Sequence, residues 1–300
     1  MPAIVMDGRL VGERLMPEIQ REAAELREKH KMKPVLAAIL VGADPASRQY
    51  VKNKRRMTGD LGFSSRLVEL SSGEASTERL LEVIDGLNRD RDVAGILLQL
   101  PVPPGVDQPR LFDAIDPLKD VDAVGAAAVA GFYRGGWGSF LPCTPRGVLE
   151  LLSYYQIDVR GKRTVVVGRS DIAGKPLALI LGGRMCNATV TWCHTRTQDL
   201  PARCREAELL VSCTGADTGA GYFITADMVS PGACVIDVGF RRLPNGRFVG
   251  DVDFDAVSKV AGWITPSPGG TGPMTVVALM QNLIDAGRYQ LGLERARYSF

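Results

Sequence analysis

Histidine is almost absent from this sequence, and its scarcity excludes one class of catalytic site. The 300 residues include only two histidines, His30 and His194. Because catalytic zinc is usually held by two or three histidines, a multi-histidine centre cannot be built here. We therefore predict no metal site in this protein.

The cysteines lack the spacing of a disulfide or zinc framework. All six lie in the second half of the chain, and none forms a C-x-x-C pair. Several fall in predicted strands, where a thiol is normally buried. We therefore expect reduced, buried thiols, as in cytosolic proteins. The six are Cys143, Cys186, Cys193, Cys204, Cys213 and Cys234.

The chain also lacks a strong charge of either sign and a long apolar run. Its net charge is +2, so nothing indicates nucleic acid or an anionic membrane as a partner. No apolar run approaches the length that spans a bilayer. The first residues, MPAIVMDGR, carry an acid where a secretory signal would continue its apolar core. We expect a cytoplasmic protein with no membrane or nucleic-acid partner.

Helical and strand patterns alternate along the chain, and its length suits two domains. This alternation predicts an α/β fold with parallel sheets. A Gly- and Ala-rich segment, 123–139, is expected to be a loop with one short helix, and 263–273 a Pro/Gly-rich loop. We predict helices over 7–30, 45–62, 77–88, 144–155 and 274–286, and strands over 34–42, 63–70, 93–100, 165–167, 188–197, 209–213 and 234–238.

The segment 164–176, TVVVGRSDIAGKP, has the pattern of a nucleotide-binding turn. A run of valines meets Gly168, and Gly174 precedes an apolar helix. A buried strand, a tight turn and a helix N-terminus in this order can hold a pyrophosphate on backbone N–H groups. The spacing G-R-S-x-x-x-G departs from G-x-G-x-x-G, and alone it also suits an ordinary strand-to-helix turn.

The next strand, within 188–197 (ATVTWCHTRT), indicates which dinucleotide binds. An NAD site carries Asp or Glu at the end of this strand for the ribose 2′-OH. Here His194, Thr195 and Arg196 follow instead, and hydroxyl and guanidinium groups suit a 2′-phosphate. Arg169 in the first turn could clamp the same phosphate. We predict NADP as the cofactor, although Arg196 alone could also be a solvated loop charge.

Tyr50, Lys54 and Gln99 are candidate catalytic residues in the first half of the chain. Tyr50 and Lys54 are four residues apart on a predicted helix, so they share a face. Short-chain dehydrogenases also use Tyr-x-x-x-Lys, but they place it after the dinucleotide fold, which excludes that family here. Gln99 is a lone amide at the end of an apolar strand, where ligands bind in parallel sheets. We expect Lys54 beside it to act as a general acid–base group, although Lys54 could instead be one of four cations on a solvated face.

Two carboxylates in the motif KDVD, Asp120 and Asp122, could form an acid pair. They are two residues apart in the sequence. One of them could bind an amino-pyrimidine ring through paired hydrogen bonds. A turn with aspartate caps explains the motif equally well.

Taken together, nine motifs in this order resemble one enzyme family along nearly the whole chain. They are similar to those of the bifunctional methylenetetrahydrofolate dehydrogenase/methenyltetrahydrofolate cyclohydrolases, the FolD type. The motifs are YVKNK (50–54), GILLQLPVP (95–103), KDVD (119–122), PCTPRG (142–147), GKRTVVVGRSDIAGKP (161–176), ATVTWCHTRT (188–197), VIDVG (235–239), VGDVDF (249–254) and TPSPGGTGPMT (265–275).

The resemblance implies two parallel-sheet, three-layer α/β domains with an interdomain cleft, in a cytosolic homodimer. Residues 1–142, with a C-terminal helix over 274–300, would form the folate-binding catalytic domain. Residues 143–273 would form a Rossmann-like NADP-binding domain. The enzyme would oxidise 5,10-methylenetetrahydrofolate with NADP and then hydrolyse the methenyl product to 10-formyltetrahydrofolate.

The resemblance also implies roles for individual residues. Lys54 would be the central group of the cyclohydrolase step, with Gln99 modulating it and Tyr50 stacking on the folate. Asp122 would hold the pterin ring, and Leu100, Gly272 and Pro273 would line the substrate site. The residues expected to contact NADP are Gly168, Arg169, Ser170, His194, Thr195, Arg196 and Phe240.

One stretch departs from the family. Residues 123–130, AVGAAAVA, replace polar groups and a turn glycine that usually follow KDVD, and Ser267 and Thr271 replace apolar residues. We hypothesise a working enzyme with an altered pocket wall. Two alternatives are a single-activity or altered-substrate member of the family, and a non-catalytic folate- or nucleotide-binding relative.

Overall fold

The computed structural model divides the chain into two compact units. It describes residues 2–134, 140–216, 218–219, 221–243 and 246–293. Of the described residues, the first unit holds 15–143 and 276–293, and the second unit holds 2–14 and 144–275. The expected boundaries differ at the N-terminus, because residues 2–14 lie in the second unit. Residues 294–300 of the expected C-terminal helix lie outside the described residues.

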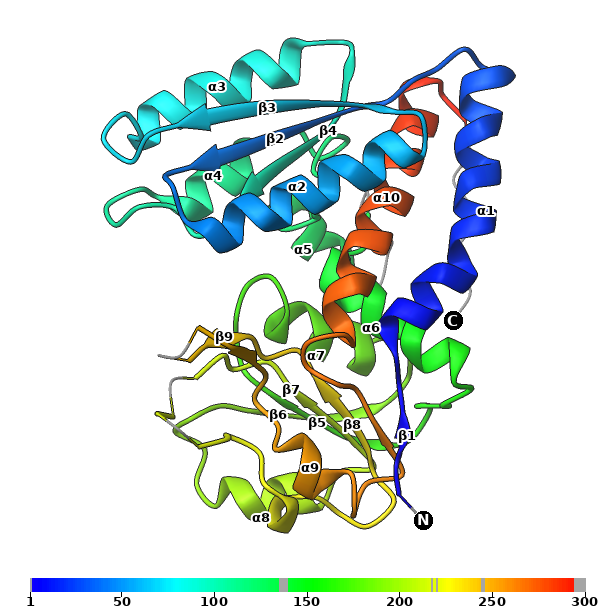
Figure 1. Ribbon diagram of the computed structural model, residues 1–300, viewed down its shortest axis with the longest axis vertical. Helices are drawn as coiled ribbons and strands as arrows, with labels where there is room; N and C mark the ends of the chain where they lie inside the picture. Colours follow the sequence, from blue (N-terminus) through cyan, green and yellow to red (C-terminus); the bar gives the residue numbers. More distant parts are fainter. Residues whose placement is uncertain (1, 135–139, 217, 220, 244–245, 294–300) are drawn as a thin grey trace. The chain divides into compact units, whose positions relative to one another are not determined.

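The first unit is built on a three-stranded parallel sheet (Figure 1). Its strands are β2 (Val35–Val41), β3 (Ser64–Leu70) and β4 (Val93–Gln99), in the order β3-β2-β4. Alternate residues of β2, such as Ala37 and Ile39, pack with α3 (Thr77–Arg89) and α4 (Gln108–Ala114). The intervening residues are buried as well, and α2 (Pro45–Asp60) contacts β2 and β3. Because both faces are covered, β2 and β4 read as continuous apolar runs, whereas β3 at the edge carries polar residues.

Side-chain caps set where the helices of this unit begin. Asp44 precedes α2, with Pro45 in the first turn, and its carboxylate accepts the N–H of Ser47 at 2.7 Å. Ser76 caps α3 in the same way through the N–H of Arg79, at 3.1 Å. Each cap satisfies a backbone donor that the helix itself cannot.

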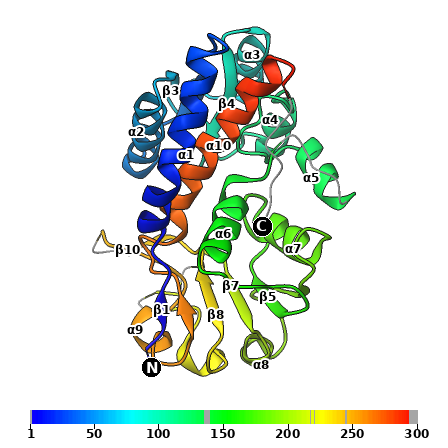
Figure 2. The ribbon, with the colours of Figure 1, turned by 90° about the vertical axis from the view of Figure 1, so that its right-hand side faces the viewer.

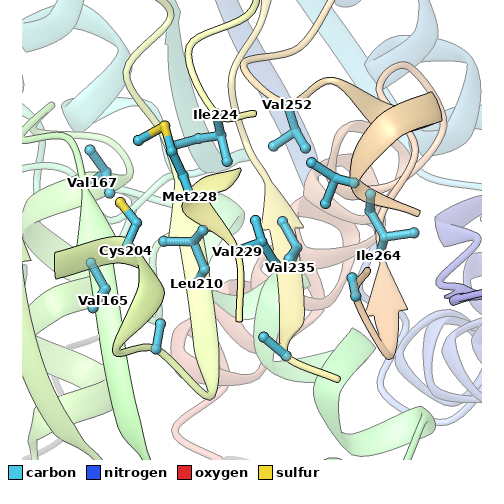
Figure 3. Packing of buried hydrophobic residues seen from close by; sticks show 14 of the residues in the cluster. Val165, Val167, Cys204, Leu210, Ile224, Met228, Val229, Val235, Val252 and Ile264 are labelled. Atoms are coloured by element: carbon cyan, nitrogen blue, oxygen red, sulfur yellow. The ribbon is translucent and has the colours of Figure 1, made fainter. Parts of the chain in front are cut away.

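The second unit contains a six-stranded, wholly parallel sheet in the order β1-β11-β8-β7-β5-β6. Buried residues from its strands form a core with residues of the covering helices (Figure 3). Val165, Leu210 and Val235 lie on this face, while Val166 and Val211 on the opposite face are also fully buried. The sheet therefore has cover on both sides. The strands are β1 (Ile4–Val5), β5 (Arg163–Val167), β6 (Thr189–Cys193), β7 (Leu209–Ser212), β8 (Cys234–Asp237) and β11 (Trp263–Ile264).

Short elements complete this unit. The hairpin of β9 (Arg241–Arg242) and β10 (Phe248–Val249) follows β8. The helices are α6 (Cys143–Tyr154), α7 (Gly174–Gly182), α8 (Leu200–Arg205), α9 (Phe254–Val257) and a 3-10 turn over Ala226–Met228. The predicted α/β fold class with parallel sheets is confirmed, and the interdomain cleft stays a prediction.

Two long helices, α1 (Gly8–Glu28) and α10 (Thr271–Gln290), have residues in both units (Figure 2). Within the first unit, Arg288 of α10 lies 3.5 Å from Glu22 of α1. Asn282 of α10 is fully buried and donates to the carbonyl oxygens of Val121 and Leu141, at 2.7 and 2.8 Å. No helix of the described residues is long and apolar enough to cross a membrane.

The expectation of a loop over 263–273 is wrong at both ends. Trp263 and Ile264 form β11, and α10 begins at Thr271 rather than 274. Proline and glycine suggested a loop, but proline fits the first turn of a helix, where its missing N–H costs nothing. Within 123–139 one short helix forms, α5 (Ala126–Tyr133), and residues 135–139 lie outside the described part.

Candidate functional site

The first unit places Lys54 against Gln99 at the point where the strand order of its sheet reverses. After β2 the chain adds β3 on one side and β4 on the other, so the carboxyl ends of β2 and β4 form a topological switch point. Ligands of open α/β sheets bind at such points. Gln99 is the last residue of β4, and its Oε1 accepts a hydrogen bond from Lys54 Nζ at 3.1 Å.

The pattern of α2 explains why a lysine is buried here. The buried positions of this helix, Ser47, Val51, Lys54 and Thr58, follow helical spacing, so Lys54 lies on the inward face. Its exposed fraction is 8%. Within the described residues Gln99 is its one side-chain hydrogen-bond partner, and no carboxylate lies within 4 Å. An ammonium carries three N–H donors, so two remain for a bound molecule.

The backbone carbonyl of Leu100 holds the side chains of Gln99 and Ser47. Its carbonyl oxygen accepts the Gln99 Nε2 donor at 2.9 Å and the Ser47 hydroxyl at 3.2 Å. Because the amide nitrogen of Gln99 is thus occupied, its oxygen faces Lys54. The predicted contact between Lys54 and Gln99 is present, and the sequence analysis missed Ser47.

Tyr50 lies one turn before Lys54 on α2 and is half-buried. Burial raises the pKa of its phenol, so the hydroxyl stays neutral around pH 7. A neutral, partly exposed ring four residues from the lysine suits stacking on a flat ligand.

In the motif KDVD, Lys119 and Asp120 hold the backbone, and Asp122 remains as the candidate for binding a ligand. Lys119 donates to three backbone carbonyls around the end of α3, including that of Asn88 at 2.7 Å. Asp120 accepts the N–H groups of Val124 and Gly125 at 3.0 and 2.9 Å. These contacts do not favour an acid pair, because Asp120 is committed to the turn.

Asp122 is the half-buried member of KDVD. The carbonyl of the preceding residue, Val121, is held by Asn282 and by the Cys143 thiol at 3.3 Å, so the backbone beside Asp122 is fixed. Among the described residues no hydrogen bond joins Asp122 to Lys54. The contribution of Asn282 could not be foreseen, because it lies on a helix 160 positions along the chain.

The second unit has its own switch point, at the carboxyl ends of β5 and β7. The chain passes from β5 to β6 on one side and then to β7 on the other. The turn after β5 begins at Gly168, whose φ is +130°, and a Cβ there would lie 2.4 Å from the carbonyl oxygen of Cys213. Only glycine fits this position. At the switch point this turn therefore presents backbone without a side chain, and the next two residues, Arg169 and Ser170, are exposed.

The end of β6 lies next to this turn. Trp192 donates its indole N–H to the carbonyl oxygen of Gly168 at 2.6 Å. The following turn is closed by hydrogen bonds between His194 and Thr197, and it leaves Thr195 and Arg196 exposed. Strand β6 ends at Cys193, so the predicted strand over 188–197 is too long. No carboxylate occupies the turn, and its hydroxyl and guanidinium groups suit a phosphate.

Two further predicted contacts lie at other edges of the second unit. Phe240, after β8, is 41% exposed and stacks on Phe248, with ring centroids 4.7 Å apart. Gly272 and Pro273 belong to the first turn of α10, and Thr271 before them donates to the carbonyl oxygen of Asp237 at 3.1 Å. They are therefore helical residues rather than the predicted loop.

Sequence profiles of one enzyme family match both parts of the chain. The profile of the tetrahydrofolate dehydrogenase/cyclohydrolase catalytic domain matches residues 6–122. The profile of the NAD(P)-binding domain of the same family matches residues 142–291. Between them they cover most of the described residues and both switch points.

Individual relatives agree with this match. The chain is 46% identical to the bifunctional protein FolD of Oleidesulfovibrio alaskensis over 97% of its length and all of the relative. The crystal structure of the FolD methylenetetrahydrofolate dehydrogenase/cyclohydrolase of Campylobacter jejuni is 38% identical, with a TM-score of 0.90 over 96% of this chain and 99% of that one. The Trypanosoma brucei enzyme, solved with NADP and an inhibitor, is 35% identical with a TM-score of 0.90 over 97% and 99%.

Proposed function

This chain belongs to the tetrahydrofolate dehydrogenase/cyclohydrolase family, and we propose that it carries out both reactions of that family. It oxidises 5,10-methylenetetrahydrofolate with NADP and hydrolyses the resulting methenyl cation to 10-formyltetrahydrofolate. The contact between Lys54 and Gln99 is the observation that carries this proposal. Binding alone does not need a buried ammonium, whereas a lysine held in place by an amide can serve as the acid–base group of the hydrolysis.

The residues of the second unit fit NADP. Gly168 presents backbone that a side chain would block, and a pyrophosphate on such a turn is stabilised by N–H groups. Arg169, Thr195 and Arg196 supply the donors that a 2′-phosphate requires. We assign Ser170, His194 and Phe240 to the same cofactor site. NADP bound there supplies the hydride acceptor for the oxidation.

The oxidation requires the chain to align the substrate with the cofactor and requires no general base. Loss of a hydride from an N–CH₂–N carbon is assisted by the nitrogen lone pairs, so no proton must be removed in that step. Tyr50 stacks on the folate ring and Asp122 accepts hydrogen bonds from its pyrimidine. Leu100, Gly272 and Pro273 line the substrate. By holding the methylene carbon in the orientation for hydride transfer, these contacts use binding energy to raise the rate of the oxidation.

The hydrolysis needs proton transfer, and Lys54 supplies it. Water adds its oxygen to the methenyl carbon and loses one proton. The new hydroxyl then loses a second proton while the carbon–nitrogen bond to N5 breaks and N5 gains a proton. One proton is released overall. Lys54 carries these protons, and Gln99 holds its ammonium at the substrate.

Two assays and one pair of variants test the assignment. Formation of the methenyl product is followed by its absorbance with NADP and with NAD, and methenyl hydrolysis is followed separately without dinucleotide. We expect Lys54→Met to abolish hydrolysis and to retain NADP binding. Lys52→Met, on the exposed face of the same helix, is the matched control and retains both activities. Retained hydrolysis in Lys54→Met would refute the role of Lys54.

A single-activity or altered-substrate enzyme is the second candidate, favoured by one segment. Residues 126–133, AAAVAGFY, form the apolar helix α5, on which Val129 and Tyr133 are exposed. A wall without polar side chains would suit a different folate derivative. Full turnover in one of the two assays, with none in the other, would identify this case.

We also propose a homodimer in the cytoplasm. The family resemblance supports both points, and the six cysteines are free and buried, as expected in a reducing compartment. Sedimentation velocity at micromolar concentration tests the dimer, and a single monomeric species would refute it.

A further inference from the structure

Two buried carboxylates of the second unit, Asp237 and Asp251, lie together at the carboxyl edge of its sheet. Asp237 ends β8 and is 2% exposed, and Asp251 is fully buried. The backbone N–H of Asp251 donates to Asp237 Oδ1 at 3.0 Å. Among the described residues, no lysine, arginine or histidine lies within 4 Å of either carboxylate. Hydrogen-bond donors surround the two carboxyl groups instead, as buried polar groups require.

Those donors come from loops that are separate in sequence. Asp251 accepts the Ser212 hydroxyl at 2.7 Å and the N–H groups of Thr214 and Gly215 at 2.8 and 3.0 Å, all at or after the end of β7. Asp237 accepts the N–H of Gly239, after β8, at 2.9 Å, and that of Val252 at 3.0 Å. The two carboxylates therefore join the loops after β7 and β8 to the segment 250–252.

Two glycines make this contact possible. A Cβ at Gly239 would lie 2.1 Å from the carboxyl carbon of Asp251, and a Cβ at Gly250 would lie 1.9 Å from Oδ2 of Asp237. Both distances are far below any van der Waals contact. Each motif therefore supplies one aspartate and one glycine: Gly239 of VIDVG leaves room for Asp251, and Gly250 of VGDVDF leaves room for Asp237.

The joined loops border the dinucleotide turn. Cys213 donates its backbone N–H to the carbonyl of Val167 at the end of β5, and its own carbonyl oxygen is where a Cβ of Gly168 would collide, at 2.4 Å. The loop that Asp251 holds at Thr214 therefore forms one side of the switch point between β5 and β7. The loop that Asp237 holds leads to Phe240.

We infer that Asp237 and Asp251 are positioning residues of the cofactor site. They hold the loops after β7 and β8 so that backbone at 213–215 and 239–240 meets the dinucleotide in a fixed arrangement. Among the described residues, their hydrogen-bond donors are backbone N–H groups and one hydroxyl, so we assign neither side chain a contact with the reacting atoms. The inference rests on the proposed function for the position of the cofactor site and for the hydrolysis assay below.

Asp251→Asn tests the inference. The amide keeps the volume but puts an NH₂ group against N–H donors, so at least one of the three hydrogen bonds is lost. We expect the dissociation constant of NADP, measured by equilibrium fluorescence titration, to rise at least about tenfold. The KM for NADP rises in parallel, while kcat at saturating NADP changes less. Methenyl hydrolysis without dinucleotide stays within about twofold, a separation that a general loss of structure would not produce.

Asp253→Asn is the matched control, two residues further in the same motif. Asp253 caps α9 through the N–H of Ala256 and holds neither loop. Its variant binds NADP as the native protein does. If Asp251→Asn does not fold, Ser212→Ala removes one donor only and raises the dissociation constant by about threefold.

Unchanged NADP affinity in the folded Asp251→Asn, or in Ser212→Ala where the former does not fold, would overturn the inference. An equal rise in Asp253→Asn would do the same. A native protein that binds NADP but hydrolyses no methenyl substrate would instead refute the proposed function, and the titration would still decide the role of the carboxylates.

Discussion

Trp192 donates its indole N–H to the carbonyl oxygen of Gly168 at 2.6 Å, which ties the end of β6 to the dinucleotide turn. Trp192 is 45% exposed, so the ring contributes little to the core, and the hydrogen bond is its distinctive contact. We expect Trp192→Phe to raise the KM for NADP by about threefold to tenfold, as for the loss of one neutral hydrogen bond. Steady-state kinetics with varied NADP measure this, with methenyl hydrolysis as the control that stays constant. An unchanged KM would show that the turn keeps its position without the indole.

A second prediction concerns the partner of the catalytic lysine. Gln99→Glu replaces the amide by a carboxylate 3.1 Å from the ammonium, so the pair becomes an ion pair that holds the proton on Lys54. We expect methenyl hydrolysis to fall by about a hundredfold, the scale of a lost general acid–base group. NADP binding stays unchanged, because Gln99 lies in the first unit. Native hydrolysis in this variant would mean that Gln99 does not act through Lys54.

A third prediction follows from the buried carboxyl of Asp120. Burial, together with the charge of Asp122, raises its pKa to about 7, and its Oδ1 is buried with no hydrogen-bond partner among the described residues. The unfolded value is about 3.9. The folded protein therefore takes up a proton that the unfolded chain has lost, and this group makes folding less favourable as the pH rises from about 4 to about 7. Above pH 7 the cost is constant.

Asp120→Asn removes this titration. The amide oxygen can still accept the N–H groups of Val124 and Gly125, and any cost of burying the NH₂ group does not depend on pH. The difference in free energy of unfolding between the variant and the native protein therefore shifts in favour of the variant by roughly 2–4 kcal/mol from pH 4 to pH 8. Thermal unfolding at several pH values measures the trend, and Asp85→Asn, an exposed ion-pair partner of Arg89, is the control. Parallel curves for Asp120→Asn and the native protein would contradict the assigned titration.

Much of the fold could be predicted because its central strands are apolar and buried on both faces. Short apolar runs such as VLAAILV and VAGILLQ, which lie between helices with clear caps, indicate buried parallel strands. The same logic placed Gln99 at a strand end and put Tyr50 and Lys54 on one face of a helix. The contact between Gln99 and Lys54 depends on the strand order β3-β2-β4, which sets the carboxyl end of β4 next to that of β2, the strand that α2 follows.

The features that could not be predicted depend on contacts between distant parts of the chain. Strand β1 has only two residues and exists because Ile4 pairs with Trp263 across most of the sequence. No local sequence pattern indicates that Asp237 and Asp251 lie together. Their contact depends on Gly239 and Gly250, which leave room for the two carboxyl groups. KDVD shows the same limit, because Lys119 and Asp120 serve the turn while Asp122 does not.

The last prediction addresses the choice between NADP and NAD. Arg196 is exposed in the turn after β6, beside Thr195, and no acid stands in that turn. Loss of a charge-assisted hydrogen bond costs about 1.5–3 kcal/mol, so Arg196→Ala should weaken NADP binding by about 10- to 100-fold and leave NAD binding nearly unchanged. Titration with both dinucleotides gives the ratio directly. Arg203→Ala, which removes a cation of α8 that is paired with Glu206, is the control. A proportional loss for both dinucleotides would mean that Arg196 supports the turn itself, because a 2′-phosphate is the one group that NADP has and NAD lacks.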